Sequence, residues 1–474
     1  MISLERANML TLFSHDAPPP SGLSIKQQRA LWLHNFLKAF IVVFVVYLCM
    51  YLVRNNFKAA QPLLKEDYGL TTTQLGYIGL AFSITYGIGK TAVGYFADGR
   101  NTKKLVSFLL VLSSLIVMAM GIILATFGSI VSIFIVLWGL NGLFQSVGGP
   151  ASYSTITRWA PRTKRGKYLG FWNASHNIGG ALAGVIALWG ARTFFGGHVA
   201  GMLIFPAIIG ISIGVIGYFY GKDDPKELGW NRCEEIFEEP IEADNLAAEQ
   251  LSKWEIFRGY VLANPWIWLL CIANVFTYIV RIGIDNWAPV YVSEELGFTI
   301  DQAVHTIFYF EIGALVASLA WGWISDIAGG RRALVATGAL VLIIGVISWY
   351  ANATTPGAVN ASLFALGALV FGPQLLIGVS LVGFVPKKAV SVTNGMTGTF
   401  GYLFGDSMAK VGLAAIADPE KNGLSILGHT LHGWQAVFTV LHVSAIAGIL
   451  MLLLVAYGEE KRIRTLRKQE NSNA

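Results

Sequence analysis

The sequence predicts an all-α polytopic membrane protein whose twelve transmembrane helices form two pseudo-symmetric six-helix halves. Three observations lead to this prediction: a very apolar composition, twelve apolar segments long enough to cross a bilayer, and a motif repeated at half the chain length. Of the 474 residues, 54% are hydrophobic and only 13% are charged. Ordinary soluble domains carry about 25% charged residues, so this composition indicates a membrane protein.

The apolar segments are each about 20 residues long, the length that crosses roughly 30 Å of hydrocarbon. In the first half they cover residues 35–57, 74–97, 105–126, 130–157, 167–191 and 200–221. In the second half they cover residues 265–288, 301–326, 332–352, 357–382, 389–416 and 432–457. The predicted domains are an N-terminal cytoplasmic segment (1–34), a first half (35–221), a cytoplasmic linker (222–264), a second half (265–457) and a cytoplasmic tail (458–474).

The distribution of positive charge predicts the orientation in the membrane. Of the 34 Lys and Arg residues, 25 fall on the side that carries both termini and 4 fall on the opposite side. Loops rich in Lys and Arg stay in the cytoplasm, so both termini are expected there. This rule also explains the net charge of +6 without a nucleic-acid partner.

The sequence gives little sign of redox, metal or catalytic chemistry. Cys49, Cys233 and Cys271 are odd in number and scattered, which excludes a disulfide framework and offers no metal-ligand spacing. No nucleophile paired with a base and no Gly-rich nucleotide loop stands out, so neither an enzyme nor a cofactor is expected. The N-terminus lacks the pattern of a removed signal peptide, so the first span is expected to remain.

An internal repeat supports the division into two halves. The stretches "GYFADGRNTKK" at 94–104 and "GWISDIAGGRR" at 322–332 match in their Gly, Asp and paired basic positions. In a second pair, "APRTKRGKYLG" and "VPKKAVSVTNG", the Pro and Gly positions match at almost the same offset. Self-similarity at half the chain length is typical of transporters built from two repeats, with the substrate site between them near the midplane.

The repeated Gly-x-x-x-Asp stretch resembles the signature loop of the major facilitator superfamily. The glycine would let two helices approach closely, and the acidic residues near a helix end would pair with basic residues across the cytoplasmic seam. A plain charged turn is the alternative. The candidate gating residues are Asp98, Lys103, Lys104, Asp326, Arg331 and Arg332.

Two arginines within apolar spans are the first candidate binding residues. Arg54 and Arg281 occupy the first span of each half, and their separation along the chain is close to the repeat offset. A guanidinium in the bilayer is costly and usually has a partner, a cavity or a ligand, although Arg54 alone could also snorkel to the interface. Two guanidiniums facing one cavity favour a phosphate or phosphate ester, with a carboxylate as the alternative.

Further polar residues lie within the spans. Lys90 is either a substrate contact or the partner of a membrane carboxylate such as Asp285 or Glu311. His176, among glycines of the fifth span, is either a phosphate contact or a hydrogen-bonded packing residue. Asp406 and Lys410 are four positions apart on one helix face, and we interpret them mainly as a self-satisfied pair.

Several longer stretches resemble the organophosphate:phosphate antiporters of this superfamily. They are "MYLVRNNF", "SITYGIGK", "FADGRNTKK", "ASYSTITRWAPRTKRGKYLGFWNASHNIGG", "YIVRIGIDNW" and "FGPQLLIGVSLVGFVPKK". The resemblance runs from about residue 30 to 460 and is strongest to the carriers of hexose 6-phosphate. It implies that Arg54 and Arg281 bind phosphate and that Lys90 and His176 handle substrate.

The sequence departs from the hexose-phosphate carriers at one point. Their eleventh span has an aspartate and, three positions later, a lysine, which are associated with substrate preference. This chain has Asn394 and Thr397 at these positions, so both charges are missing together and the net charge of the site is unchanged. These two residues are therefore candidate determinants of which organophosphate is accepted.

The resemblance implies a transport function and a cellular place. The chain is expected to import hexose 6-phosphate or a related organophosphate in exchange for inorganic phosphate, by rocker-type alternating access. It is expected in the bacterial inner membrane, in contact with the lipid bilayer, as a monomer and without a nucleic-acid partner. The alternative within the family is a membrane receptor for sugar phosphate that acts with a sensor kinase.

Overall fold

The computed structural model describes residues 12–16, 18–97, 100–239, 253–385, 389–418, 424–426 and 429–473. The first half contains α1 (Ile25–Tyr68), α2 (Thr72–Ala97), α3 (Thr102–Phe127), α4 (Val131–Gln145), α5 (Gly148–Trp159), α6 (Arg162–Phe194) and α7 (Ala200–Phe219). The described part of the linker contains short helical turns: η2 (Pro225–Leu228), α8 (Cys233–Ile236), α10 (Lys253–Ile256) and η3 (Phe257–Leu262).

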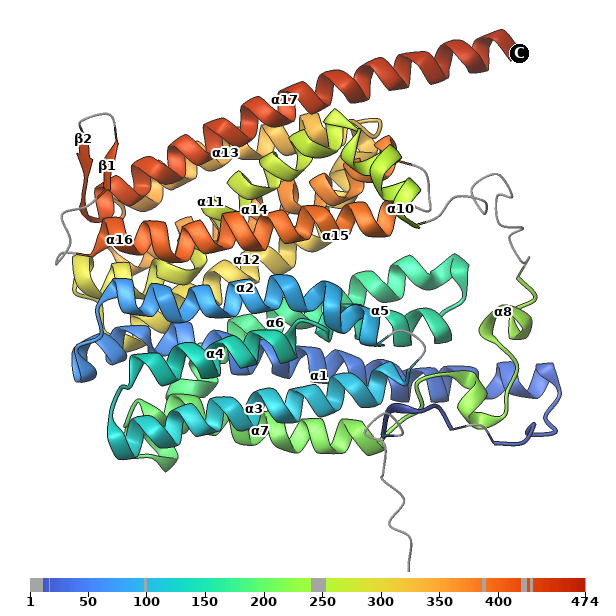
Figure 1. Cartoon of the computed structure of the whole chain (residues 1–474), viewed down its shortest axis with the longest axis horizontal. Coiled ribbons are helices and arrows are strands. Elements are labelled where there is room, and N and C mark those ends of the chain that lie inside the picture. The colour runs from blue at the N-terminus through green and yellow to red at the C-terminus, as the bar shows by residue number, and fades with distance from the viewer. Residues whose placement is uncertain are drawn as a thin grey trace, which may run out of the picture.

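The second half repeats this order of long helices. It contains α11 (Pro265–Leu296), α12 (Ile300–Ile327), α13 (Arg332–Asn352), α14 (Pro356–Phe384), α15 (Val390–Phe400), η5 (Gly401–Asp406), η6 (Met408–Gly412), α16 (Leu413–Ala417) and α17 (Gly433–Asn473). The segment α15–η5–η6–α16 is one continuous span with two π-helical stretches. Figure 1 shows α1–α7 on one side of the molecule and α11–α17 on the other.

The twelve predicted spans correspond to twelve long helical segments, with α4 and α5 forming one interrupted span. In the described part of the chain, eight helices are long and apolar enough to cross a membrane on length and composition alone. The other four segments are α2, α6, α12 and α15–α16. The predicted all-α class is confirmed. A short antiparallel hairpin of β1 (Leu424–Ile426) and β2 (His429–Leu431), which was not predicted, precedes α17.

The first helix of each half ends in the same way. Gly69 ends α1 and Gly297 ends α11, and both have a φ of 64°, the left-handed conformation that glycine adopts without strain. At its start, α1 is fixed by a capping box between Ser24 and Gln27. The helix α1 continues to Tyr68, well past the predicted end of its span at position 57, because a helix need not end where the hydrocarbon does.

A buried carboxylate caps the third helix of each half. Asp223, which follows α7, accepts hydrogen bonds from the backbone N–H groups of Thr102 and Lys103 at 3.0 Å. Glu459, on α17, accepts one from the backbone N–H of Ala333 at 2.9 Å. A carboxylate at a helix N-terminus satisfies free N–H groups and the helix dipole. Each cap therefore ties the third helix of a half to its sixth.

Small residues allow close packing within each half. A side chain at Gly313 of α12 would place its Cβ 2.1 Å from the backbone oxygen of Phe364, and one at Gly367 of α14 would lie 2.0 Å from that of Phe310. The two helices are thus in reciprocal contact at glycine, as is common where membrane helices pack closely.

The two halves contact each other at one end of the molecule, which we call the closed end. There Lys65 pairs with Glu294 at 2.5 Å, and Arg192 pairs with Asp301 at 2.6 Å. At the opposite end, which carries the linker, the ion pairs found between described residues lie within one half, as for Arg331 and Glu460. Among the described residues, the ion pairs that join the halves at an end of the molecule therefore lie at the closed end. Toward the linker end, the halves are separated by cavities of about 500 and 570 Å³ that residues of both halves line.

Candidate anion-binding site

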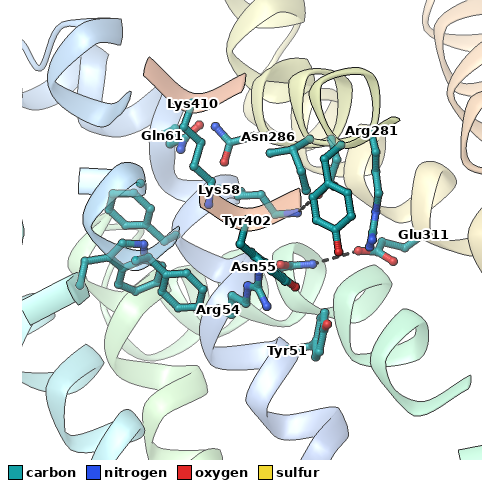
Figure 2. A pocket seen from close by; sticks show the side chains of 17 residues that line it. Tyr51, Arg54, Asn55, Lys58, Gln61, Arg281, Asn286, Glu311, Tyr402 and Lys410 are labelled. Carbon is teal, nitrogen blue, oxygen red and sulfur yellow. Dashed lines mark hydrogen bonds and ion pairs between the residues drawn. The ribbon is translucent and has the colours of Figure 1, made fainter. Parts of the chain in front are cut away.

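The two intramembrane arginines meet in one pocket between the halves. Arg54 lies on α1 and Arg281 on α11, and both line a small cavity of about 50 Å³. Figure 2 shows them reaching this pocket from the helices of opposite halves. The pocket is lined by Tyr51, Arg54, Asn55, Phe57, Lys58, Gln61, Gly79, Phe82, Trp138, Tyr278, Arg281, Ile282, Asp285, Asn286, Glu311, Tyr402 and Lys410. The arginines therefore share a cavity, and snorkelling of Arg54 to the interface is not observed.

Arg54 is surrounded by aromatic rings. Its Cζ lies 5.3 Å from the ring centre of Tyr51, 4.6 Å from that of Phe82 and 4.9 Å from that of Tyr86. Such cation–π contacts stabilise a guanidinium by about 0.5–1 kcal/mol at exposed sites and by about 2 kcal/mol or more when it is desolvated. Among the described residues, none offers a hydrogen-bond acceptor or carboxylate to this side chain, so its N–H groups are available to a ligand.

Arg281 has one fixed partner. Its Nη1 donates to Oε1 of Gln374, and its Cζ lies 4.0 Å from the ring centre of Phe371. Its Nε is buried and has no partner among the described residues. Since no described carboxylate forms an ion pair with it, the charge of Arg281 is also left without a counter-ion.

Lys90 adds a third cation without a described carboxylate partner. Its Nζ lies 5.4 Å from the ring centre of Tyr86 and 4.9 Å from that of Tyr402. The alternative that Lys90 pairs with Asp285 or Glu311 is not observed, because these carboxylates contact other residues of the pocket. Lys90 instead lines a larger cavity of about 500 Å³ that Arg281 also lines.

His176 lies on the wall of the same larger cavity. Its side chain is buried, and its ring stacks on Phe371 of α14 at 6.2 Å with an angle of 28° between the planes. The ring of Tyr51, on α1, lies 5.2 Å away. His176 is thus brought within the candidate site, where the halves meet and beside the ring that supports Arg281.

Lys58 and Asp285 form a buried ion pair at 2.6 Å between the halves. The sequence reasoning missed Lys58, which it assigned to the loop beyond a span ending at residue 57. The signal was nevertheless present: Lys58 and Asp285 are 227 residues apart, as are Arg54 and Arg281. Equivalent positions of the two halves therefore contact each other directly, one turn along from the arginines.

Glu311 and Lys410 complete the polar surroundings of the pocket. Oε1 of Glu311 accepts a hydrogen bond from Asn55 at 3.1 Å. Lys410 pairs with Asp406 at 3.0 Å and donates to the hydroxyl of Ser83 at 2.8 Å. The predicted Asp406–Lys410 pair is confirmed, and it also joins the two halves through Ser83.

The two candidate specificity residues lie toward the linker end. Asn394 lines the cavity of about 500 Å³ and a further one of about 570 Å³. Thr397 lines the second of these, where its hydroxyl donates to the backbone oxygen of Thr393 at 3.0 Å. Nδ2 of Asn274 donates to the backbone oxygen of Thr397 at 2.9 Å. These positions therefore contribute amide and hydroxyl groups, without charge, to the wall beyond the cations.

The candidate gating residues of the first half make contacts within that half. Nζ of Lys103 donates to three backbone oxygens at the end of α7, at 2.9 to 3.1 Å. Lys104 lies 3.5 Å from Asp16 of the N-terminal segment. Asp98 lies outside the described residues. The pairing expected across the seam with Asp98 or Asp326 stays a prediction, because the side chains of both aspartates lie outside the described part of the structure.

The candidate gating residues of the second half behave in the same way. Arg331 pairs with Glu460 of α17 at 3.0 Å. Nη1 of Arg332 donates to the backbone oxygen of Val379 at 3.5 Å. The side chain of Asp326 lies outside the described part of the structure. Among the described residues, Arg331 and Arg332 therefore also contact their own half.

Two repeated halves around unpaired cations define a membrane carrier, and the comparisons with known proteins agree. The chain belongs to the Major Facilitator Superfamily, whose family model matches residues 43–406, and within it to the organophosphate:phosphate antiporters. It is 48% identical to the hexose-6-phosphate:phosphate antiporter of Salmonella typhimurium, over 98% of this chain and 100% of the relative. It is 50% identical to that of Escherichia coli K12, over 97% and 98%.

More distant relatives and solved structures extend this result. The glycerol-3-phosphate transporter of Bacillus subtilis is 32% identical over 94% of this chain and 98% of the relative. A bacterial homologue of the human lysosomal transporter Spinster, in an inward-facing and unoccupied conformation, has a TM-score of 0.66 at 14% identity. That likeness covers 91% of this chain and 97% of the other, and at this identity it shows the fold alone.

Proposed function

We propose that this chain imports hexose 6-phosphate, or a closely related organophosphate, in exchange for inorganic phosphate. The observation that carries the proposal is the shared pocket of Arg54 and Arg281, which have no described carboxylate partner. Guanidinium groups from opposite halves suit a dianionic phosphoryl group, because their paired N–H donors match phosphate oxygens. The names of the relatives at 48% and 50% identity support the same substrates.

The proposed orientation places both termini and the linker in the cytoplasm of a bacterial inner membrane. The excess of Lys and Arg on that side supports it. The separated end of the molecule would then face the cytoplasm, and the closed end, with its Lys65–Glu294 and Arg192–Asp301 pairs, would face outward. Transport requires a second state in which the fastened and separated ends are exchanged.

The coupling of binding to movement is proposed to be electrostatic. Without a ligand, closure of the halves would enclose the three positive charges of Arg54, Arg281 and Lys90 in a water-poor space, where like charges repel more strongly than in water. A bound dianion offsets most of that repulsion and lets the halves close around it. Because the empty carrier changes state slowly, the result is exchange of anions without net leak.

The organic part of the substrate is assigned to the larger cavity toward the linker end. Beyond the arginines, the wall offers the amide group of Asn394 and, further out, that of Asn274. Amides donate to and accept from hydroxyl groups, as a sugar requires. Competition of phosphate exchange by hexose phosphates, glycerol phosphate and phosphoglycerate would rank the candidates and test the influence of Asn394 and Thr397.

Exchange in proteoliposomes tests the proposed function. Vesicles loaded with phosphate should take up labelled hexose 6-phosphate, and they should lose phosphate rapidly only when an exchangeable anion is present outside. Rapid phosphate efflux into buffer without such an anion would refute obligatory exchange. Absence of any exchange with phosphate or with the whole panel of esters would refute the proposal itself.

We infer that the protein acts as a carrier and not as an enzyme or a receptor, and that it works as a monomer without nucleic acid. Uptake of hexose 6-phosphate in cells that lack other sugar-phosphate carriers would support the carrier role. A signal through a sensor kinase without uptake would identify the receptor instead.

A further inference from the structure

We propose that Gln374 is a positioning residue that orients Arg281 for the anion, so that the two arginines play unequal parts. Arg281 would be a preset anchor, and Arg54 would be the arginine that adjusts to the ligand. This inference rests on the proposed function, because it concerns how the same site holds its phosphoryl group. It names a residue on α14, an element to which the sequence assigned no site residue.

The contacts of Gln374 join three side chains. Its Oε1 accepts a hydrogen bond from Nη1 of Arg281, and its Nε2 donates to the hydroxyl of Tyr278 at 3.1 Å. Tyr278 lies on α11, three positions before Arg281. Both ends of the amide are therefore held by the same helix, which fixes the amide plane and with it the direction of the Arg281 side chain.

The same face of α14 provides a second restraint. Phe371 lies three positions before Gln374, and residues at this spacing are neighbours on a helix surface. Its ring centre is 4.0 Å from Cζ of Arg281. The ring supports the guanidinium while the amide holds one of its edges, so the remaining N–H groups point to a defined region of the cavity.

Arg54 has no comparable restraint among the described residues. Its contacts there are the ring faces of Tyr51, Phe82 and Tyr86, and ring faces do not fix the direction of individual N–H groups as a hydrogen bond does. The pseudo-symmetry of the two arginines is thus broken by their surroundings. A ligand would meet one preset guanidinium and complete the coordination of the other.

The choice of glutamine has a chemical reason. A neutral amide oxygen can orient a guanidinium without cancelling its charge, whereas a carboxylate at the same place would form an ion pair and compete with the phosphoryl group. Preset donors bind an anion more tightly because less reorganisation accompanies binding. Gln374 would therefore raise the affinity for phosphate through Arg281 without touching the phosphate itself.

Two substitutions of similar size separate orientation from charge. In Gln374→Met, the acceptor is lost, and we expect the KM for phosphate exchange to rise about tenfold while the maximal rate changes by less than about threefold. In Gln374→Glu, the acceptor remains but carries charge, and we expect a larger rise than in Gln374→Met. If Gln374 only filled space, Gln374→Glu would raise the KM less than Gln374→Met, because glutamate has nearly the shape of glutamine and keeps the hydrogen-bond acceptor.

The matched control is Gln145→Met. Gln145 is a buried glutamine of α4 that donates to Ser113 at 3.0 Å and lines none of the cavities described above. Its loss should lower the melting temperature in detergent and leave the KM for phosphate unchanged. The rise in melting temperature produced by added phosphate gives a second readout of binding for any variant that does not transport.

The outcomes distinguish this inference from the proposed function. If the wild type exchanges phosphate and both Gln374 variants keep its KM, the positioning role is wrong and the proposed function stands. If Gln374→Glu binds phosphate as tightly as the wild type, the argument from charge is wrong. If the wild type neither exchanges phosphate nor is stabilised by it, the proposed function itself fails.

Discussion

The five cations that line the pocket and the adjoining larger cavity fall into two groups according to their partners. Lys58 and Lys410 each have a carboxylate within 3.2 Å, whereas Arg54, Arg281 and Lys90 have none among the described residues. A charge in a buried ion pair depends on its partner, because removal of that partner leaves an uncompensated charge, whereas an unpaired charge in a cavity indicates a ligand of opposite charge. The division therefore separates the residues that hold the halves together from those that bind.

Substitution of Arg54 tests its part in binding. We expect Arg54→Lys to raise the KM for phosphate by at least about tenfold, because a lysine keeps the charge but loses the forked donors that match phosphate. Exchange of labelled phosphate in proteoliposomes measures the effect. Arg29, which lies over the ring of Phe237 at the linker end, gives the control Arg29→Lys, and its exchange should equal that of the wild type. An unchanged KM in Arg54→Lys would contradict the assignment.

At the scale of elements, α1 and α11 carry the site as a repeated unit. Tyr51 and Tyr278, Arg54 and Arg281, and Lys58 and Asp285 share one separation along the chain, that of 227 residues. Every member of these pairs lines the pocket. The repeat thus places equivalent residues on both sides of one cavity. Among these pairs only Lys58 and Asp285 differ in residue type, and their charges are opposite.

The near-symmetry of this pair predicts that its charges can be exchanged. Lys58→Met and Asp285→Asn should each lower the free energy of unfolding by about 3 kcal/mol, because each leaves a buried charge unpaired. The double variant Lys58→Asp with Asp285→Lys should recover most of that loss. Thermal unfolding in detergent measures all three variants. The prediction would be contradicted if the double variant lost as much free energy of unfolding as the two single variants together.

The N-terminal segment provides a second prediction at this scale. Nδ1 of His15 lies 2.8 Å from Oε1 of Glu227. Its Nε2 lies 3.8 Å from Oδ2 of Asp223 and 3.3 Å from Nη1 of Arg158. The hydrogen bond to Glu227 raises the pKa of His15 above 6.5, against the effect of burial. The protonated form therefore stabilises docking, and this contribution is complete below pH 6.5 and lost as the pH rises through the raised pKa.

Hydrogen exchange of residues 12–16 would detect this effect. Protection from exchange, corrected for the intrinsic rate, should be greater at pH 6 than at pH 8.5 in the wild type. In His15→Gln the difference should vanish, since glutamine does not titrate. A pH dependence of equal size in both proteins would show that another group is responsible.

At the scale of the whole molecule, the closed end is held by two ion pairs and by close helix packing, since a Cβ at Gly184 of α6 would lie 2.7 Å from Val304 of α12. Arg192 and Asp301 are about half exposed, and exposed ion pairs contribute less than about 1 kcal/mol. Lys65 and Glu294 are more buried. The exposed pair therefore adds little to the free energy of the closed state, which suits a carrier that must alternate between two states.

Removal of both pairs should therefore shift the population of states without unfolding the protein. In Lys65→Ala with Arg192→Ala, we expect spin labels at positions 127 and 352, on the closed-end termini of α3 and α13, to report more of the long distances than in the wild type. The melting temperature should change little. Identical distance distributions in the two proteins would show that these pairs do not hold this end closed.

Much of this architecture could be predicted from the sequence, and the limits have physical causes. The repeat offset led to Arg54 and Arg281 because burying a guanidinium is costly and therefore informative. Lys58 was missed because the length of hydrocarbon was taken as the length of the helix, which continues to Tyr68. Gln374 was missed because a neutral amide in a span carries no such signal, and only the three-dimensional contact with Arg281 reveals it.

The most direct test of the account is a structure determined in the presence of inorganic phosphate. We predict one tetrahedral density between the halves, within about 3 Å of the guanidinium nitrogens of both Arg54 and Arg281. Density that contacts only one of these arginines, or that lies at Lys90 and His176 away from both, would contradict the claim that the two halves share a single phosphoryl group.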